Sequence, residues 1–221
     1  MNSGAIRGNK GGGICGSGVT VAGGAFIMNG GTICNNDADS AGTVTMIGGN
    51  FIMNDGTIRD NTARSGGAVM ANRGTFTMNG GTISGNTAAI NGGAVTVGVD
   101  GAFNMGGGTI YGNKAGGHGG GVYVGITGNF YMNGGTISHN IAAYYGWGVY
   151  VSGTFTKTGG TILGHADGAG NANAADSINL GLAVYAYSNS GVRKRRENTA
   201  GPEINLSYSG RNGEWSGEWD Y

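Results

Sequence analysis

The residues best suited to do chemistry in this 221-residue chain are carboxylates in its first third, with basic side chains nearby. Glycosidases act through paired carboxylates, and acidic oxygens are also the ligands that calcium prefers. Asp37, Asp39 and Asp60 are therefore weak metal candidates. Because isolated carboxylates more often solvate turns, we expect no catalytic residue, metal or cofactor, and keep a carbohydrate-active enzyme as the alternative. The group comprises Asp37, Asp39, Asp55, Asp60, Arg59 and Arg64.

A second group of candidates is aromatic and lies in the middle of the chain. Exposed aromatic rings bind the faces of sugars or contact protein partners, whereas packed rings only fill corners. We take the first interpretation for five residues and keep ordinary surface packing as the other. These candidate binding residues are Tyr111, Tyr131, Tyr144, Tyr145 and Trp147; Tyr123 and Tyr150 lie among them.

Other chemical signals are weak. His118, His139 and His165 occupy unrelated positions, so we predict no metal or general-base role for them. The basic run Arg193–Arg196 is expected to be a solvated loop, since the chain has 12 basic and 12 acidic residues. This balance predicts no nucleic-acid partner. Membrane insertion is not expected either, because no apolar run approaches the roughly 18 residues that span a bilayer.

The strongest pattern is a segment of about 11 residues that occurs six times. Its phenylalanines are separated by 25, 25, 27, 27 and 25 residues, and a period of that size is typical of stacked repeats. Glycine supplies 52 residues, yet 38% of the chain is apolar, which argues against disorder. The repeats begin at Phe26, Phe51, Phe76, Phe103, Phe130 and Phe155.

One repeat shows how these residues are positioned. Short strands are expected at 66–71, 75–78 and 81–84, with turns at 72–74, 79–80 and 85–88. Alternation places Phe76 and Met78 on one face and Thr77 on the other. Stacking then aligns equivalent Phe, Met, Ile and Val residues in internal columns, with Lys157 interrupting the Met column. The sequence therefore predicts an all-β fold, a right-handed parallel β-helix of about seven turns with three short strands per turn.

Polar residues also recur with the repeat. Two asparagine columns, one from Asn29 and one from Asn36, are expected to form amide ladders or to stand at left-handed corners, rather than to bind sugars. An outward threonine column runs from Thr32 to Thr161. Such a column resembles an ice-binding face, but the neighbouring outward position is irregular, so an ice-binding protein is a minor alternative.

Two segments carry a resemblance to known families. Ile83–Ala88 followed by Gly92–Val95 resembles the paired Phe-x-x-Asn and Gly-Gly-Ala-Ile motifs of chlamydial polymorphic outer-membrane proteins, with Ile83 in place of Phe. The chain is also similar to spirochaete and gut-bacterial surface repeat adhesins, whose last turn reads much like Gly181–Tyr185 followed by Thr199–Pro202. The resemblance covers nearly the whole chain and implies an extracellular or cell-surface location, but no substrate.

The ends of the chain differ from its middle. Residues 1–165 are interpreted as β-helix repeats that start in mid-turn, as in a fragment of a longer protein, and 166–221 as a last turn with an irregular cap. The open first turn predicts end-to-end self-association. The sequence does not decide whether Cys15 and Cys34 form a disulfide or are free thiols. We expect a non-catalytic, adhesin-like scaffold that binds glycans or proteins.

Overall fold

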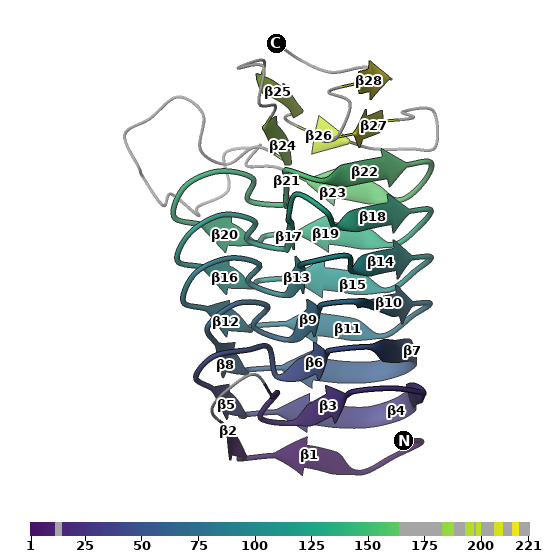
Figure 1. Cartoon of the computed structure of the whole chain (residues 1–221), viewed down its shortest axis with the longest axis vertical. Helices are drawn as coiled ribbons and strands as arrows, with labels where there is room; N and C mark the ends of the chain where they lie inside the picture. Colours follow the sequence, from purple (N-terminus) through teal and green to yellow (C-terminus); the bar gives the residue numbers. More distant parts are fainter. Residues whose placement is uncertain are drawn as a thin grey trace.

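The structure is a computed structural model that describes residues 1–11, 15–163, 183–187, 193–196, 198–199, 206–209 and 214–216. In this part of the chain it is a parallel β-solenoid of about six turns, here called coils, stacked along one axis (Figure 1). The predicted fold class is therefore confirmed. The predicted count of seven coils included Ile6 and Val184, which belong to incomplete coils at the two ends.

Three sheets form the walls of the solenoid. Sheet A contains β1 (Ala5–Arg7), β4 (Ala25–Cys34), β7 (Gly49–Arg59), β10 (Gly74–Met78), β11 (Thr82–Ser84), β14 (Ala102–Met105), β15 (Thr109–Tyr111), β18 (Asn129–Met132), β19 (Thr136–Ser138), β22 (Thr154–Lys157), β23 (Thr161–Leu163), β26 (Asn198–Thr199), β27 (Leu206–Ser209) and β28 (Glu214–Ser216). Sheet B contains β2 (Lys10–Gly11), β5 (Asp37–Ala38), β8 (Thr62–Ala63), β12 (Thr87–Ala88), β16 (Lys114–Ala115) and β20 (Ile141–Ala142). Sheet C contains β3 (Val19–Val21), β6 (Val44–Met46), β9 (Val69–Ala71), β13 (Val95–Val97), β17 (Val122–Val124), β21 (Val149–Val151), β24 (Val184–Tyr187) and β25 (Arg193–Arg196).

Sheet B is the part of the coil that the sequence interpretation missed. A turn was predicted at 85–88, whereas the structure places the two-residue strand β12 there. Ala88 is buried and pairs with Ala63 on one side and Ala115 on the other. A strand of two residues is too short to show an alternating pattern, so only its stacking against equivalent residues reveals it.

The interior consists of the predicted columns. Phe76 pairs with Phe51 and Phe103 in register, and from Phe51 to Phe155 these side chains are fully buried. Centroids of neighbouring Phe rings lie between 4.7 and 5.3 Å apart along the axis. The Met column does not end at Lys157: this lysine pairs with Met132 and is buried in the same column. Burying one such apolar side chain stabilises the fold by about 2 kcal/mol, and each column contributes this once per coil.

One glycine column shows why the coils require glycine. Gly81 has a φ of 82°, and a Cβ atom there would lie 2.6 Å from the Met53 Cε atom of the preceding coil. Gly108 has the same relation to Met78, with a φ of 81°. The methionine ends can move, but a Cβ atom would also lie 2.7 Å from the Gly56 carbonyl oxygen at Gly81 and 2.8 Å from the Gly81 carbonyl oxygen at Gly108. The left-handed backbone and these carbonyls therefore exclude a side chain at these corners.

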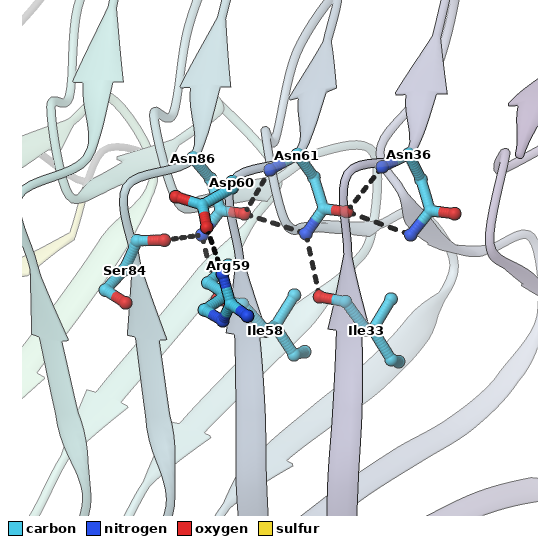
Figure 2. A network of polar contacts seen from close by, with 8 residues as sticks. All are labelled: Ile33, Asn36, Ile58, Arg59, Asp60, Asn61, Ser84 and Asn86. Atoms are coloured by element: carbon cyan, nitrogen blue, oxygen red, sulfur yellow. Dashed lines mark hydrogen bonds and ion pairs between the residues drawn. The ribbon is translucent and has the colours of Figure 1, made fainter. Parts of the chain in front are cut away.

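A buried asparagine ladder follows sheet A along the axis (Figure 2). Asn61 donates from Nδ2 to Asn86 Oδ1 at 2.9 Å and to the Ile33 carbonyl at 3.0 Å, and Asn86 Oδ1 also accepts the Asn61 backbone N–H. The pattern runs through the buried residues Asn36, Asn61, Asn86, Asn113 and Asn140. The predicted amide ladder is therefore present. The predicted left-handed geometry is wrong for this column; among its neighbours, Asn35, Asp60 and His139 have positive φ instead.

The direction of pairing changes at the C-terminal side. β25 pairs antiparallel with β24, β26 with β23 and β27 with β22, while β28 pairs with β27. The parallel stacking stops here, because β26 and β27 pair antiparallel with β23 and β22 of the last complete coil (Figure 1). The run Arg193–Arg196, predicted as a solvated loop, is strand β25 instead. The predicted boundary at 165/166, His165, and the tail residues Trp219 and Tyr221 lie outside the described residues. Cys15 and Cys34 are both free, the first exposed and the second buried.

Candidate functional site

The outer face of sheet C changes character along the rod. The middle residue of each sheet C strand points outward, between two valines or similar residues that point inward. In the first coils this outward column consists of threonines and one methionine; in the last coils it consists of tyrosines. In order, the column reads Thr20, Thr45, Met70, Thr96, Tyr123, Tyr150 and Tyr185.

Loops between sheets B and C fold back over this column. In the first coils they form hydrogen bonds with the threonines: the Thr45 hydroxyl donates to the Gly42 carbonyl at 2.8 Å, and the Thr96 hydroxyl to the Asn91 carbonyl at 2.9 Å. In the last coils the loops bring rings instead. His118 stacks on Tyr150 with ring centroids 4.6 Å apart, and Tyr145 stacks on Tyr185 at 4.5 Å.

We call the resulting cluster the aromatic patch. Its rings are nearly parallel within the tyrosine column, where Tyr123 and Tyr150 are 5.4 Å apart with an interplanar angle of 2°. Stacking of this kind adds about 1 kcal/mol per pair beyond the burial of area. The rings are therefore held rigidly against sheet C. The aromatic patch comprises His118, Tyr123, Tyr144, Tyr145, Tyr150 and Tyr185.

His118 is neutral in this arrangement. Its Nδ1 atom accepts the backbone N–H of Tyr145 at 3.3 Å, so the ring proton is on Nε2. One coil earlier, the Asn91 Oδ1 atom accepts the His118 backbone N–H at 2.9 Å in the same way. Burial among the rings lowers the pKa of His118 below its ordinary value of 6.5. Burial, and then the neighbouring Tyr150, raise the pKa of the Tyr123 hydroxyl.

Tyr144 is the exposed member of the aromatic patch. Its side chain is 57% exposed, while Tyr150 and Tyr185 are buried. The Tyr144 ring is tilted by 42° against His118, with centroids 5.4 Å apart. The patch therefore presents one exposed ring beside three half-buried rings and two buried ones, and none of its six members is a carboxylate, lysine or arginine.

The other predicted binding residues lie elsewhere. Trp147 is only 7% exposed and packs with Ala115 and Ala142. Tyr111 and Tyr131 are exposed, as alternation predicted, but they belong to β15 and β18 of sheet A. Of the five candidates, the structure brings Tyr144 and Tyr145 together.

Sequence reasoning missed the role of His118 and the stacking of Tyr123, Tyr150 and Tyr185. The Val-Tyr-Val segments at 122–124 and 149–151 carried a usable signal, since the tyrosine between two inward valines must point outward. No comparable signal places His118, because it lies in a loop.

The predicted acidic group is spread over separate corners. Asp60 forms a salt bridge with Arg59, the neighbouring residue (Figure 2). Asp55 accepts the Gly56 backbone N–H at 2.7 Å, at the corner before Thr57, whereas Asp60 follows the end of β7. Asp37 is placed in sheet B opposite Lys10 and Thr62, and Asp39, directly after β5, is exposed. In the part of the chain that the structure describes, no three His, Cys, Asp or Glu residues lie close enough to hold a metal ion.

The remaining polar columns are regular. Exposed Asn54 donates to Asn29 and accepts from Asn79, which gives a second amide ladder on the surface. The threonine column is in register from Thr32 to Thr161, and its side chains are half-buried. The neighbouring outward position, between Phe and Met, is in register but irregular in composition, as predicted: it holds Ile27, Ile52, Thr77, Asn104, Tyr131 and Thr156.

Among the described residues, no helix has the length and hydropathy needed to cross a membrane. Comparisons of the chain with protein-family models, with curated proteins and with solved structures found no match. The resemblance to chlamydial and other bacterial surface repeat proteins therefore stays a prediction from the motifs, and the fold and the aromatic patch are the basis for any functional assignment.

Proposed function

We propose that the chain is a non-catalytic, extracellular scaffold of the adhesin type that binds a glycan at the aromatic patch. The observation that carries this proposal is the exposed Tyr144 ring, supported by stacked rings whose positions are fixed. Sugars offer apolar ring faces that pack on tyrosine, and a ring that is already ordered loses little conformational entropy on binding.

The chemistry of the aromatic patch favours a neutral glycan over a charged one. Its six side chains are histidine and tyrosines, and the lowered pKa of His118 keeps this ring uncharged at neutral pH. Tyrosine hydroxyls donate and accept hydrogen bonds, as sugar hydroxyls require. None of the six members carries a charge at neutral pH, although the basic strand β25 (Arg193–Arg196) pairs with β24 at this end of sheet C.

The rod contributes geometry rather than chemistry. Each coil adds about 4.8 Å along the axis, so the patch extends over three coils that rest on a continuous core. A binding surface on such a rod is rigid and keeps a constant distance from whatever the rest of the rod contacts. This arrangement is typical of display and attachment rather than of turnover.

A glycan array tests the proposal with the Tyr144→Ala variant. We expect the unaltered chain to bind neutral glycans and the variant to lose about tenfold in affinity, since one sugar–aromatic contact contributes on the order of 1–2 kcal/mol. Tyr131→Ala is the matched control, because Tyr131 is a 40% exposed tyrosine on sheet A, outside the aromatic patch.

Two outcomes would contradict the proposal. If no glycan binds, or if Tyr131→Ala weakens binding as much as Tyr144→Ala, the aromatic patch is not a glycan site. Cleavage of a bound polysaccharide would instead support the enzymatic alternative, and Asp37→Asn and Asp60→Asn would then be the first variants to compare.

A further inference from the structure

A hollow of about 380 Å³ opens on the molecule's surface beside Met70, apart from the aromatic patch. Met70 belongs to the outward column of sheet C, between Thr45 and Thr96. The hollow is lined by the apolar residues Ala41, Ile47, Met70 and Val99 and by the polar residues Ser40, Asn72 and Arg73. None of these residues belongs to the aromatic patch.

The hollow lies where the loop length changes along the rod. The segment from Ala88 to Val95 is one residue longer than the equivalent segment from Ala63 to Val69, and that from Val95 to Phe103 is one longer than that from Val69 to Phe76. Val99, in one of these longer loops, is 53% exposed and lines the opening.

The composition of the hollow is that of a small-molecule site. Ligand pockets are mostly apolar, have volumes of about 300–1,000 Å³ and carry a few polar groups that orient the ligand. Here Ile47 and Val99 expose apolar surface that a ligand would remove from water. Ser40 and Asn72 add a hydroxyl and an amide at the same opening.

Arg73 supplies the charge. Among the described residues, it is the one charged residue that lines the hollow. It takes no part in the salt bridge found in this part of the chain, which joins Arg59 to Asp60. Asp39 and Asp100 adjoin lining residues in sequence but do not line the hollow themselves. Arg73 has a φ of 52°, and its backbone N–H donates to the Val99 carbonyl at 2.8 Å, which attaches the arginine to the longer loop.

We propose that this hollow binds a small amphiphilic carboxylate. Its hydrocarbon part packs against Met70, Ile47 and Val99, and its carboxylate pairs with the Arg73 guanidinium. Arginine binds carboxylates through two parallel hydrogen bonds, and such charge-assisted bonds are about twice as strong as neutral ones. An apolar floor beside a single unpaired cation selects this ligand over a neutral hydrocarbon and over a strongly hydrated anion.

Methyl NMR of the methionines tests the proposal with decanoate as the probe. The chain has eight methionines, and Met70 is the one on the hollow. We expect decanoate to shift the Met70 methyl signal saturably and to leave the signals of the buried Met78, Met105 and Met132 in place. Decanol, which has the same chain without the charge, should bind at least tenfold more weakly.

Arg73→Asn removes the charge with little effect on folding, because asparagine adopts left-handed backbone readily. It should weaken decanoate binding about tenfold or more, whereas Arg64→Asn, at an exposed arginine outside the hollow, should not. Tyr144→Ala should also leave decanoate binding unchanged, so the result is independent of the glycan proposal. The proposal is overturned if decanoate leaves Met70 unshifted, if decanol binds equally well, or if Arg73→Asn binds decanoate normally.

Discussion

Two aromatic stacks run along this rod, one inside it and one outside. Inside, Phe76 and Phe103 lie 4.8 Å apart and belong to a column with phenylalanine in all six complete coils. Outside, Tyr123 and Tyr150 lie 5.4 Å apart, but the same column holds threonine or methionine in the earlier coils. The three sheets fix the volume available to each interior side chain, so the same residue type recurs in every coil. The outer face accepts any side chain that its loops can cover. Differences between coils on the outside are therefore where ligand binding is to be sought.

The largest expected effect is at the interior stack. Phe103→Ala should lower the free energy of unfolding by about 4 kcal/mol, because it removes a fully buried ring and leaves a cavity. Each coil contacts only its neighbours, so a cavity in a middle coil weakens the connection between the two halves of the rod. Chemical denaturation followed by circular dichroism measures the change.

The matched variant on the outer stack is Tyr123→Ala. Its side chain is half-buried, and we expect a loss of about 1–2 kcal/mol. An equal loss of unfolding free energy for Phe103→Ala and Tyr123→Ala would show that the outer stack stabilises the fold as much as the core does. The proposed difference between the inner and outer stacks would then be wrong.

The interior was the part of the molecule most open to prediction. A fixed period and strict alternation place Phe76, Met78 and Ile83 inward without any knowledge of the loops, because every coil repeats the same constraint. His118 and Trp147 were not predictable, since each lies in a loop between sheets B and C whose path depends on the coil below. The hollow beside Met70 is lined by residues of neighbouring coils, from Ser40 to Val99, and the sequence does not show that they meet until the coils are stacked.

The two asparagine ladders allow the same comparison between interior and surface for polar side chains, since one ladder is buried and the other is exposed. Asn86 is buried and its Nδ2 atom donates to the Ile58 carbonyl and to Asn113, while its Oδ1 atom accepts from Asn61. Asn86→Ala should cost about 3 kcal/mol in unfolding free energy, because it leaves several buried groups without partners. Asn54, in the exposed ladder, loses partners that water replaces, so Asn54→Ala should cost about 0.5 kcal/mol or less.

Chemical denaturation of Asn86→Ala and Asn54→Ala under identical conditions compares their unfolding free energies directly. Similar losses for Asn86→Ala and Asn54→Ala would mean that amide stacking itself stabilises the rod, regardless of burial. A large loss at Asn86 alone would assign the stability to the satisfaction of buried polar groups.

The smallest expected effect is the pH response of the outer stack. Folding lowers the pKa of His118 below 6.5 through burial, so the unfolded chain binds a proton on this residue at a higher pH than the folded chain does. His118 therefore contributes no pH dependence above about pH 7.5, and stability falls as the pH drops through 6.5 toward the lowered pKa. Protonation also removes the Nδ1 acceptor for the Tyr145 N–H. Thermal unfolding between about pH 7.5 and 5.5, where most carboxylates stay ionised, follows this loss. His118→Asn is the control, because it reproduces the acceptor that Asn91 provides one coil earlier and does not titrate; a slope that persists in this variant would place the proton elsewhere.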